Sequence, residues 1–122
     1  MQTQENVELL LQKVIEGIRE KKGKGILIAD LTAIEDCICR YFVICEGNSP
    51  NQVSAIASSV KDLLKKNAYI KPFSVDGTGN AQWVAMDYGD VVIHIFLPEI
   101  REYYQLENLW SDAKLEKIPD LD

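Results

Sequence analysis

A helix-start signal near the middle of the chain most constrains the fold. Ser49 is followed by Pro50 and, three residues after the serine, by Gln52. This is a capping box with proline at the first helical position, where its missing N–H costs nothing. An apolar stripe at helical spacing follows, made of Val53, Ile56, Ala57, Val60 and Leu64. The pattern predicts a helix over about residues 50–67.

The segments on either side of this helix are typical of strands. Residues 38–45 form a β-branched and aromatic run, and residues 73–76 form a shorter one after the helix. A strand–helix–strand unit implies a right-handed crossover, and therefore one parallel pair of strands.

Two further segments come before this unit. Residues 4–22 carry apolar side chains on one stripe at helical spacing, which predicts a helix. Lys21 and Lys22 suit the negative, C-terminal end of the helix dipole, and Gly23 suits the helix terminus. The apolar run at residues 26–29 is typical of a buried strand. An amphipathic helix therefore precedes the first strand.

The last third opens with a hairpin pattern. Residues 82–87 and 90–97 are strand-like, and the sequence Asp87-Tyr88-Gly89-Asp90 joins them. Gly89 can adopt a positive φ, so we expect a tight antiparallel hairpin. Residues 99–104 predict a short helix after Pro98.

These elements give the order αββαβββα. We expect an α/β (α+β) fold in which helices pack on a mixed sheet of about five strands. The 122 residues suffice for one domain, so we assign residues 1–122 to a single domain.

Composition and charge exclude several classes of protein. The 47% hydrophobic fraction excludes a disordered chain, and no apolar run approaches the roughly 18 residues of a membrane span. A polar, acidic N-terminus and an odd number of cysteines indicate reduced thiols in the cytoplasm. Residues 1–24, 25–75 and 76–122 carry net charges of +1, 0 and −7. Such an acidic end suits a basic protein partner, or solubility alone, better than it suits nucleic acid.

The sequence offers few candidate residues for metal binding or catalysis. Cys37 and Cys39 are too closely spaced for a usual zinc site and lack a second pair, so we expect no metal. Asp87 and Asp90 could hold Mg²⁺ or could cap the turn between them. His94 could act as a base, but no nucleophile accompanies it, which favours a structural or surface histidine.

Five tryptophan and tyrosine residues lie in the acidic last third: Trp83, Tyr88, Tyr103, Tyr104 and Trp110. Such residues usually complete a core. Aromatic side chains ringed by acids are also typical of an interface hot spot with a polar rim. Both interpretations stay open at this point.

Two blocks of the last third resemble the ribosomal silencing factor family, RsfS, also called the Iojap family. Residues 82–96 carry its signature stretch, and residues 101–110, Arg-Glu-Tyr-Tyr-Gln-Leu-Glu-Asn-Leu-Trp, its next block. Residues 41–45, 47–49 and 52–57 match its upstream pattern. Two positions depart from that pattern, since Arg40 replaces an aspartate and Asp76 replaces a glutamate. The resemblance covers roughly residues 5–113.

The resemblance implies a fold similar to that of nucleotidyltransferases. Enzymes of that superfamily carry a Gly-Ser pair and an Asp-x-Asp metal motif at the sheet. This chain has no Gly-Ser pair, and its expected strands contain no Asp-x-Asp motif. We therefore expect no catalysis and no cofactor.

The resemblance implies a translation repressor that binds the large ribosomal subunit through ribosomal protein L-fourteen. Such a factor blocks joining of the small subunit when nutrients are scarce, with no direct nucleic-acid readout and no membrane. The expected contact residues are Trp83, Met86, Tyr88, Asp90, Arg101, Tyr104, Leu106, Leu109 and Trp110, of which Trp83 and Met86 could instead be core. The alternatives are a nucleotidyltransferase-type enzyme using Asp87 and Asp90, or a homodimeric adaptor without a ribosomal role.

Overall fold

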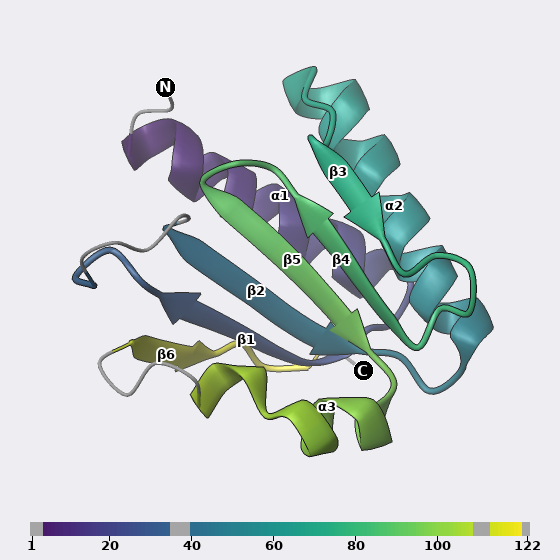
Figure 1. Cartoon of the computed structure of the whole chain (residues 1–122). Helices are drawn as coiled ribbons and strands as arrows, with labels where there is room; N and C mark the ends of the chain where they lie inside the picture. The colour runs from purple at the N-terminus through teal and green to yellow at the C-terminus, as the bar shows by residue number, and fades with distance from the viewer. Residues whose placement is uncertain (1–3, 35–39, 109–112, 121–122) are drawn as a thin grey trace.

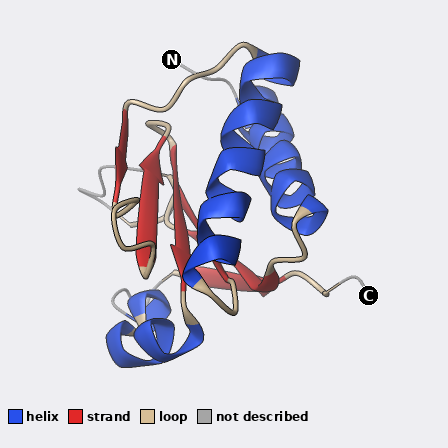
Figure 2. Ribbon diagram, turned by 90° about the vertical axis from the view of Figure 1, so that its right-hand side faces the viewer, coloured by secondary structure: helices blue, strands red, loops and turns tan. Residues whose placement is uncertain are grey.

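The computed structural model describes residues 4–34, 40–108 and 113–120. It contains α1 (Gln4–Glu20), β1 (Lys24–Asp30), β2 (Tyr41–Glu46), α2 (Pro50–Ala68), β3 (Ser74–Asp76), β4 (Trp83–Asp87), β5 (Val91–Phe96), α3 (Pro98–Tyr104), the 3-10 helix η1 (Leu106–Asn108) and β6 (Lys114–Lys117). Helices α1 and α2 cover one face of the sheet, and α3 lies at one end of the molecule on the other side of the sheet (Figure 1). Figure 2 shows this arrangement from the side.

The strands form one mixed sheet in the order β3-β4-β5-β2-β1-β6. Only β2 and β5 pair in parallel; the other neighbours are antiparallel. The predicted fold class is confirmed, with one parallel pair and a hairpin between β4 and β5. The parallel partner of β2 is β5, because β3 lies at the sheet edge beyond β4.

The sixth strand differs from the expected count of about five. β6 has the sequence Lys-Leu-Glu-Lys, and all four of its residues are exposed. It pairs with β1 through backbone hydrogen bonds. Without a buried face, its side chains carry no strand periodicity.

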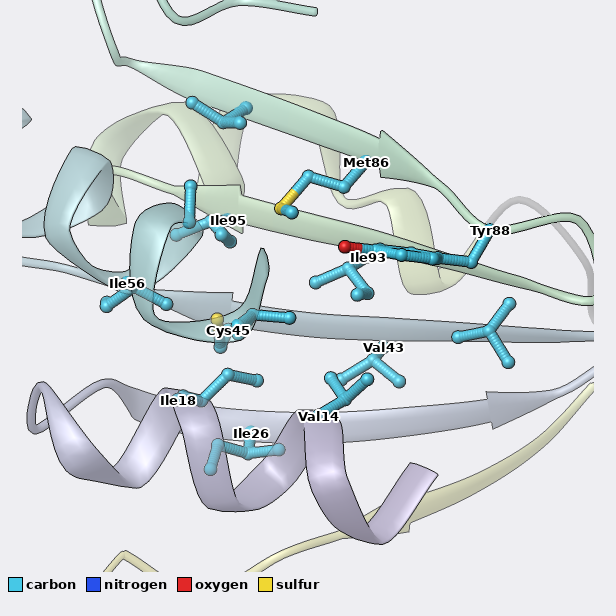
Figure 3. Packing of buried hydrophobic residues seen from close by; sticks show 14 of the residues in the cluster. Val14, Ile18, Ile26, Val43, Cys45, Ile56, Met86, Tyr88, Ile93 and Ile95 are labelled. Carbon is cyan, nitrogen blue, oxygen red and sulfur yellow. The ribbon is translucent and has the colours of Figure 1, made fainter. Parts of the chain in front are cut away.

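The core between the helices and the sheet is apolar. Figure 3 shows Val14 and Ile18 of α1 close to Val43 and Cys45 of β2, with Ile56 of α2 beside them. The two helices pack closely at Gly17 of α1, where a Cβ atom would lie only 2.9 Å from Cα of Val60. The absence of a side chain on Gly17 therefore allows this close approach. The Ser59 hydroxyl donates a hydrogen bond of 2.8 Å to the Gly17 carbonyl, so this buried polar group has a partner.

The start of α2 fixes how the two long helices meet. The Ser49 side chain accepts a hydrogen bond from the Gln52 N–H at 3.1 Å, as the capping box requires. The Gln52 amide oxygen accepts from the Asn48 N–H at 2.6 Å, and its NH₂ group donates to the carbonyls of Lys21 and Lys22. One side chain therefore joins the start of α2 to the end of α1.

Candidate functional site

An aromatic cluster occupies the face of the sheet opposite α1 and α2. The Trp83 ring of β4 stacks on the Phe96 ring of β5, with 4.9 Å between their centroids. The Tyr104 ring of α3 lies 4.8 Å from the Trp83 ring. The Trp83 indole N–H donates a hydrogen bond of 3.1 Å to Nδ1 of His94. Phe42 of β2 packs against the imidazole at 4.8 Å, edge to face. The cluster joins α3 to the sheet and holds the Trp83 ring in place.

His94 supports this cluster from inside. It is 7% exposed, and burial lowers its pKa from 6.5 to about 4. The ring is therefore neutral near pH 7, with Nδ1 accepting from Trp83 and the hydrogen on Nε2. Nε2 has no hydrogen-bond partner among the described residues. The structure thus confirms the structural interpretation of this histidine.

Helix α3 displays the aromatic residues that are most exposed on this side of the molecule. It begins at Pro98 and ends where Gln105 adopts a left-handed conformation with φ of 45°. None of its seven residues is fully buried. Tyr103 is 80% exposed and Tyr104 is 49% exposed, and the exposed acids Glu99 and Glu102 lie on the same helix. We call Trp83, Glu99, Glu102, Tyr103 and Tyr104 the α3 surface.

Arg101 anchors this helix to the sheet. Its guanidinium donates a hydrogen bond of 2.6 Å to the Gly25 carbonyl of β1 and lies 3.7 Å from the Glu46 carboxylate of β2. Gly25 has φ of 60°, which glycine adopts readily, and a Cβ there would meet the guanidinium. Arg101 thus holds α3 against the ends of two central strands.

The structure corrects three of the expected contact residues. Met86 is fully buried, Tyr88 is 3% exposed and Leu106 is 8% exposed. Met86 and Tyr88 face the helices because they alternate with Trp83 along the β4 hairpin, and Leu106 packs into the core of the second face. Leu106 therefore lies on the same face of the sheet as Trp83, whereas Met86 and Tyr88 belong to the core beneath α1 and α2.

The structure describes four of the other six expected contact residues, and these four do not all lie in one place. Asp90 lies in the β4–β5 turn, at the opposite end of β5 from α3. Leu109 and Trp110 lie outside the described residues. Among the expected residues that the structure describes, Trp83, Arg101 and Tyr104 lie at α3 without being fully buried. Tyr103, which the expected set leaves out, is the most exposed aromatic residue of the α3 surface. Its place beside Tyr104 in an acidic segment is the sequence signal that could have indicated it.

Sites of metal or thiol chemistry have little support in the described structure. The Asp87 carboxylate accepts the Gly89 N–H at 2.8 Å, so it caps the turn, in which Gly89 has φ of 87°. In residues 4–34, 40–108 and 113–120, no group of three or more His, Cys, Asp or Glu side chains could hold a metal ion. Cys45 is buried, and desolvation raises its pKa to about 12; Cys37 and Cys39 lie outside the described residues. No described helix combines the length and apolarity needed to cross a membrane.

Comparisons with known proteins agree on one family. The family model described as "Ribosomal silencing factor during starvation" matches residues 3–122. Ribosomal silencing factor RsfS of Bacillus subtilis (strain 168) is 40% identical over 110 residues, which cover 90% of this chain and 92% of that protein. The chloroplastic protein Iojap of Zea mays is 39% identical over 80 residues, 66% of this chain and 34% of its own length. A crystal structure of a Chromobacterium violaceum protein superposes with a TM-score of 0.81 at 32% identity, covering 93% of this chain and 92% of that one.

Proposed function

Because this chain belongs to the ribosomal silencing factor family RsfS, we propose that it represses translation by binding the large ribosomal subunit. The proposed contact is ribosomal protein L-fourteen, and the proposed consequence is that the small subunit cannot join. This mechanism needs an interaction surface and no chemistry. The protein would act in the cytoplasm, without a cofactor, when nutrients are scarce.

The observation that carries this proposal is the α3 surface. Tyr103 and Tyr104 are exposed, Tyr104 contacts Trp83, and the exposed acids Glu99 and Glu102 lie on the same helix. Tyrosine and tryptophan are enriched at interface hot spots, where they bury large rings at little entropic cost. A rim of acids suits a basic partner, and ribosomal proteins that contact ribosomal RNA are generally basic.

The contact set combines two exposed tyrosines with the half-buried tryptophan that one of them contacts. Trp83, Tyr103 and Tyr104 are the proposed aromatic anchors, and Arg101 positions them by fixing α3 to β1 and β2. Leu109 and Trp110 remain proposed contacts because they directly follow this segment in the sequence. Asp90 is proposed to act through its charge, from the other end of the hairpin.

Sedimentation with isolated ribosomal subunits tests the proposal. The protein should pellet with large subunits and stay in the supernatant with small subunits. Large subunits loaded with the protein should then form fewer complete ribosomes when small subunits are added. Lys13→Glu on the outer face of α1 serves as a folded control that should behave like the parent.

The alternative functions predict other outcomes. A homodimeric adaptor would give a stable dimer in solution and no pelleting with either subunit. A nucleotidyltransferase-type enzyme would give product from labelled nucleoside triphosphates and Mg²⁺, and the product would disappear in Asp87→Asn. Either outcome would contradict the proposal.

A further inference from the structure

The acidic chain carries a basic region at the end of α2, in addition to the basic residues that end α1 and follow it. Residues 61–75 contain Lys61, Lys65, Lys66 and Lys71 against a single acid, Asp62. Their net charge is +3, so the rest of the chain carries −9 to give the total of −6. All four lysines are exposed. Residues 25–75 are neutral as a whole, but their positive charge is concentrated in residues 61–75.

Three of these four lysines line one hollow. Lys61 and Lys65 lie one helical turn apart on α2. Tyr69 ends the helix in a left-handed conformation with φ of 57°, and the Ile70 N–H donates to the Leu64 carbonyl, so the chain reverses. Lys61, Lys65 and Lys71 then line a hollow of about 410 Å³ together with residues of β3. Three cations around one recess favour an anion.

Two exposed aromatic rings belong to the same turn. Tyr69 is 90% exposed and Phe73 is 81% exposed. Neither ring is explained by the core, and the Phe73 ring lies beside Gly89 of the neighbouring turn. We call Lys61, Lys65, Lys66, Tyr69, Lys71 and Phe73 the basic patch. Figure 1 shows this end of α2 and helix α3 at opposite ends of the sheet, so the basic patch is separate from the α3 surface.

We propose that the basic patch binds the phosphate backbone of single-stranded or looped RNA on the large subunit, with Tyr69 and Phe73 stacking on bases. This inference rests on the proposed function, which brings the protein to the ribosome. Lysines around exposed aromatic rings are typical of sequence-tolerant RNA binding, because every base has a face on which a ring can stack. The proposed contacts are lysines to phosphates and aromatic rings to base faces, and neither kind of contact distinguishes one base from another.

RNA fits this patch better than a lipid surface does. An anionic membrane would repel the −9 of the remaining chain, whereas an RNA segment can enter the hollow between α2 and β3. The same repulsion keeps the patch weak in isolation. It contributes once the α3 surface has placed the protein on the large subunit, in the way that linked sites reinforce one another.

The salt dependence of large-subunit binding tests the inference. The triple variant Lys61→Gln, Lys65→Gln, Lys71→Gln should flatten the slope of log K against log[salt] by about 2 between roughly 50 and 200 mM salt, since each lost phosphate contact removes about 0.7 from the slope. The triple variant Lys13→Gln, Lys21→Gln, Lys22→Gln removes the same charge from α1 and the residues after it, and should leave the slope unchanged. Circular dichroism of both variants shows whether each is folded.

The outcomes separate this inference from the proposed function. If the parent fails to bind large subunits, both proposals are wrong. If the parent binds and the two triple variants have equal slopes, only the RNA contact is wrong. A photo-crosslinking phenylalanine derivative in place of Tyr69 should label ribosomal RNA. Labelling of ribosomal protein alone would show that this patch contacts protein, and would overturn the inference.

Discussion

The indole N–H of Trp83 donates a hydrogen bond of 3.1 Å to Nδ1 of His94 across the β4–β5 ladder. The bond requires an unprotonated Nδ1, and burial lowers the His94 pKa to about 4, so the acceptor is present near pH 7. Trp83 in turn stacks on Phe96 and touches Tyr104. One neutral imidazole therefore determines the position of the ring that links the sheet to α3.

The pKa of His94 predicts a loss of stability in mild acid. The unfolded state takes up the proton near pH 6.5, whereas the folded state resists it down to about pH 4. The free energy of unfolding should be unaffected by His94 above pH 6.5, fall as the pH drops from 6.5 toward 4, and level off below that. The full loss is about 3 kcal/mol at 1.36 kcal/mol per pKa unit. Urea unfolding across this pH range measures it.

His94→Gln is the control for this titration. The glutamine amide can accept from the Trp83 indole but does not titrate. The difference in unfolding free energy between parent and variant should shrink as the pH falls from 6.5. If this difference stays constant with pH, His94 takes up a proton as easily in the folded state as in the unfolded state, which would contradict the prediction.

Apolar patterns predicted most of the fold, because the two long helices each bury one apolar stripe and the strands β1, β2 and β5 are almost wholly buried. The predicted helix over residues 50–67 is α2, Pro50–Ala68, since its buried stripe and its cap agree. β6 could not be found in this way, because an exposed edge strand pairs through its backbone and its side chains carry no pattern. The sequence also could not predict that β5 is the parallel partner of β2, because the order of strands in a sheet depends on contacts between distant segments.

The candidate surface was predicted less well than the fold. Alternation along β4 places Trp83 and Met86 on opposite faces, but nothing in that segment says which face the long helices cover. Exposure of Tyr103 depends on how α3 docks, and Arg101 fixes that through Gly25 and Glu46, both far away in sequence. Such contacts are tertiary, so a local pattern cannot reveal them.

Tyr88→Phe should leave the protein as stable as the parent or make it more stable. The Tyr88 hydroxyl is buried without a hydrogen-bond partner among the described residues, and desolvation raises its pKa to about 12. An unsatisfied buried hydroxyl costs about 1–3 kcal/mol, and phenylalanine removes it while keeping the ring. Thermal unfolding measures the change, with the exposed Tyr103→Phe as the matched control. A clear drop in the melting temperature of Tyr88→Phe would mean that the hydroxyl has a partner.

The cap of α2 predicts two graded losses of stability. Ser49→Ala removes one hydrogen bond to the Gln52 N–H and should cost about 0.5–2 kcal/mol. Gln52→Ala should cost more, because this side chain bonds Asn48 and both carbonyls at the end of α1. Chemical denaturation gives both values, and large-subunit binding should survive in both variants. A Ser49→Ala protein of unchanged stability would contradict the role of the cap.

Asp90→Lys should slow association with large subunits mainly at low salt. Asp90 lies at the opposite end of β5 from α3, and six strand residues span roughly 20 Å. That separation exceeds the Debye length of about 8 Å at physiological ionic strength but is within the 30 Å of 0.01 M salt. Stopped-flow association at both salt concentrations tests this, with Glu102→Lys on α3 as the comparison that should slow association at both. Equal behaviour of the two variants would place Asp90 inside the contact.

Tyr104→Ala is the most direct test of the α3 surface. The ring is half-exposed and packs on Trp83, so its loss removes an interface anchor and little of the core. An anchor in a desolvated interface contributes about 2 kcal/mol or more, which is at least a twentyfold loss of affinity for large subunits. Trp110→Ala should behave in the same way, while Lys13→Glu should bind like the parent. Thermal unfolding of Tyr104→Ala should stay cooperative; if the variant unfolds instead, the ring is core, and if both variants bind like the parent, the partner contacts another surface.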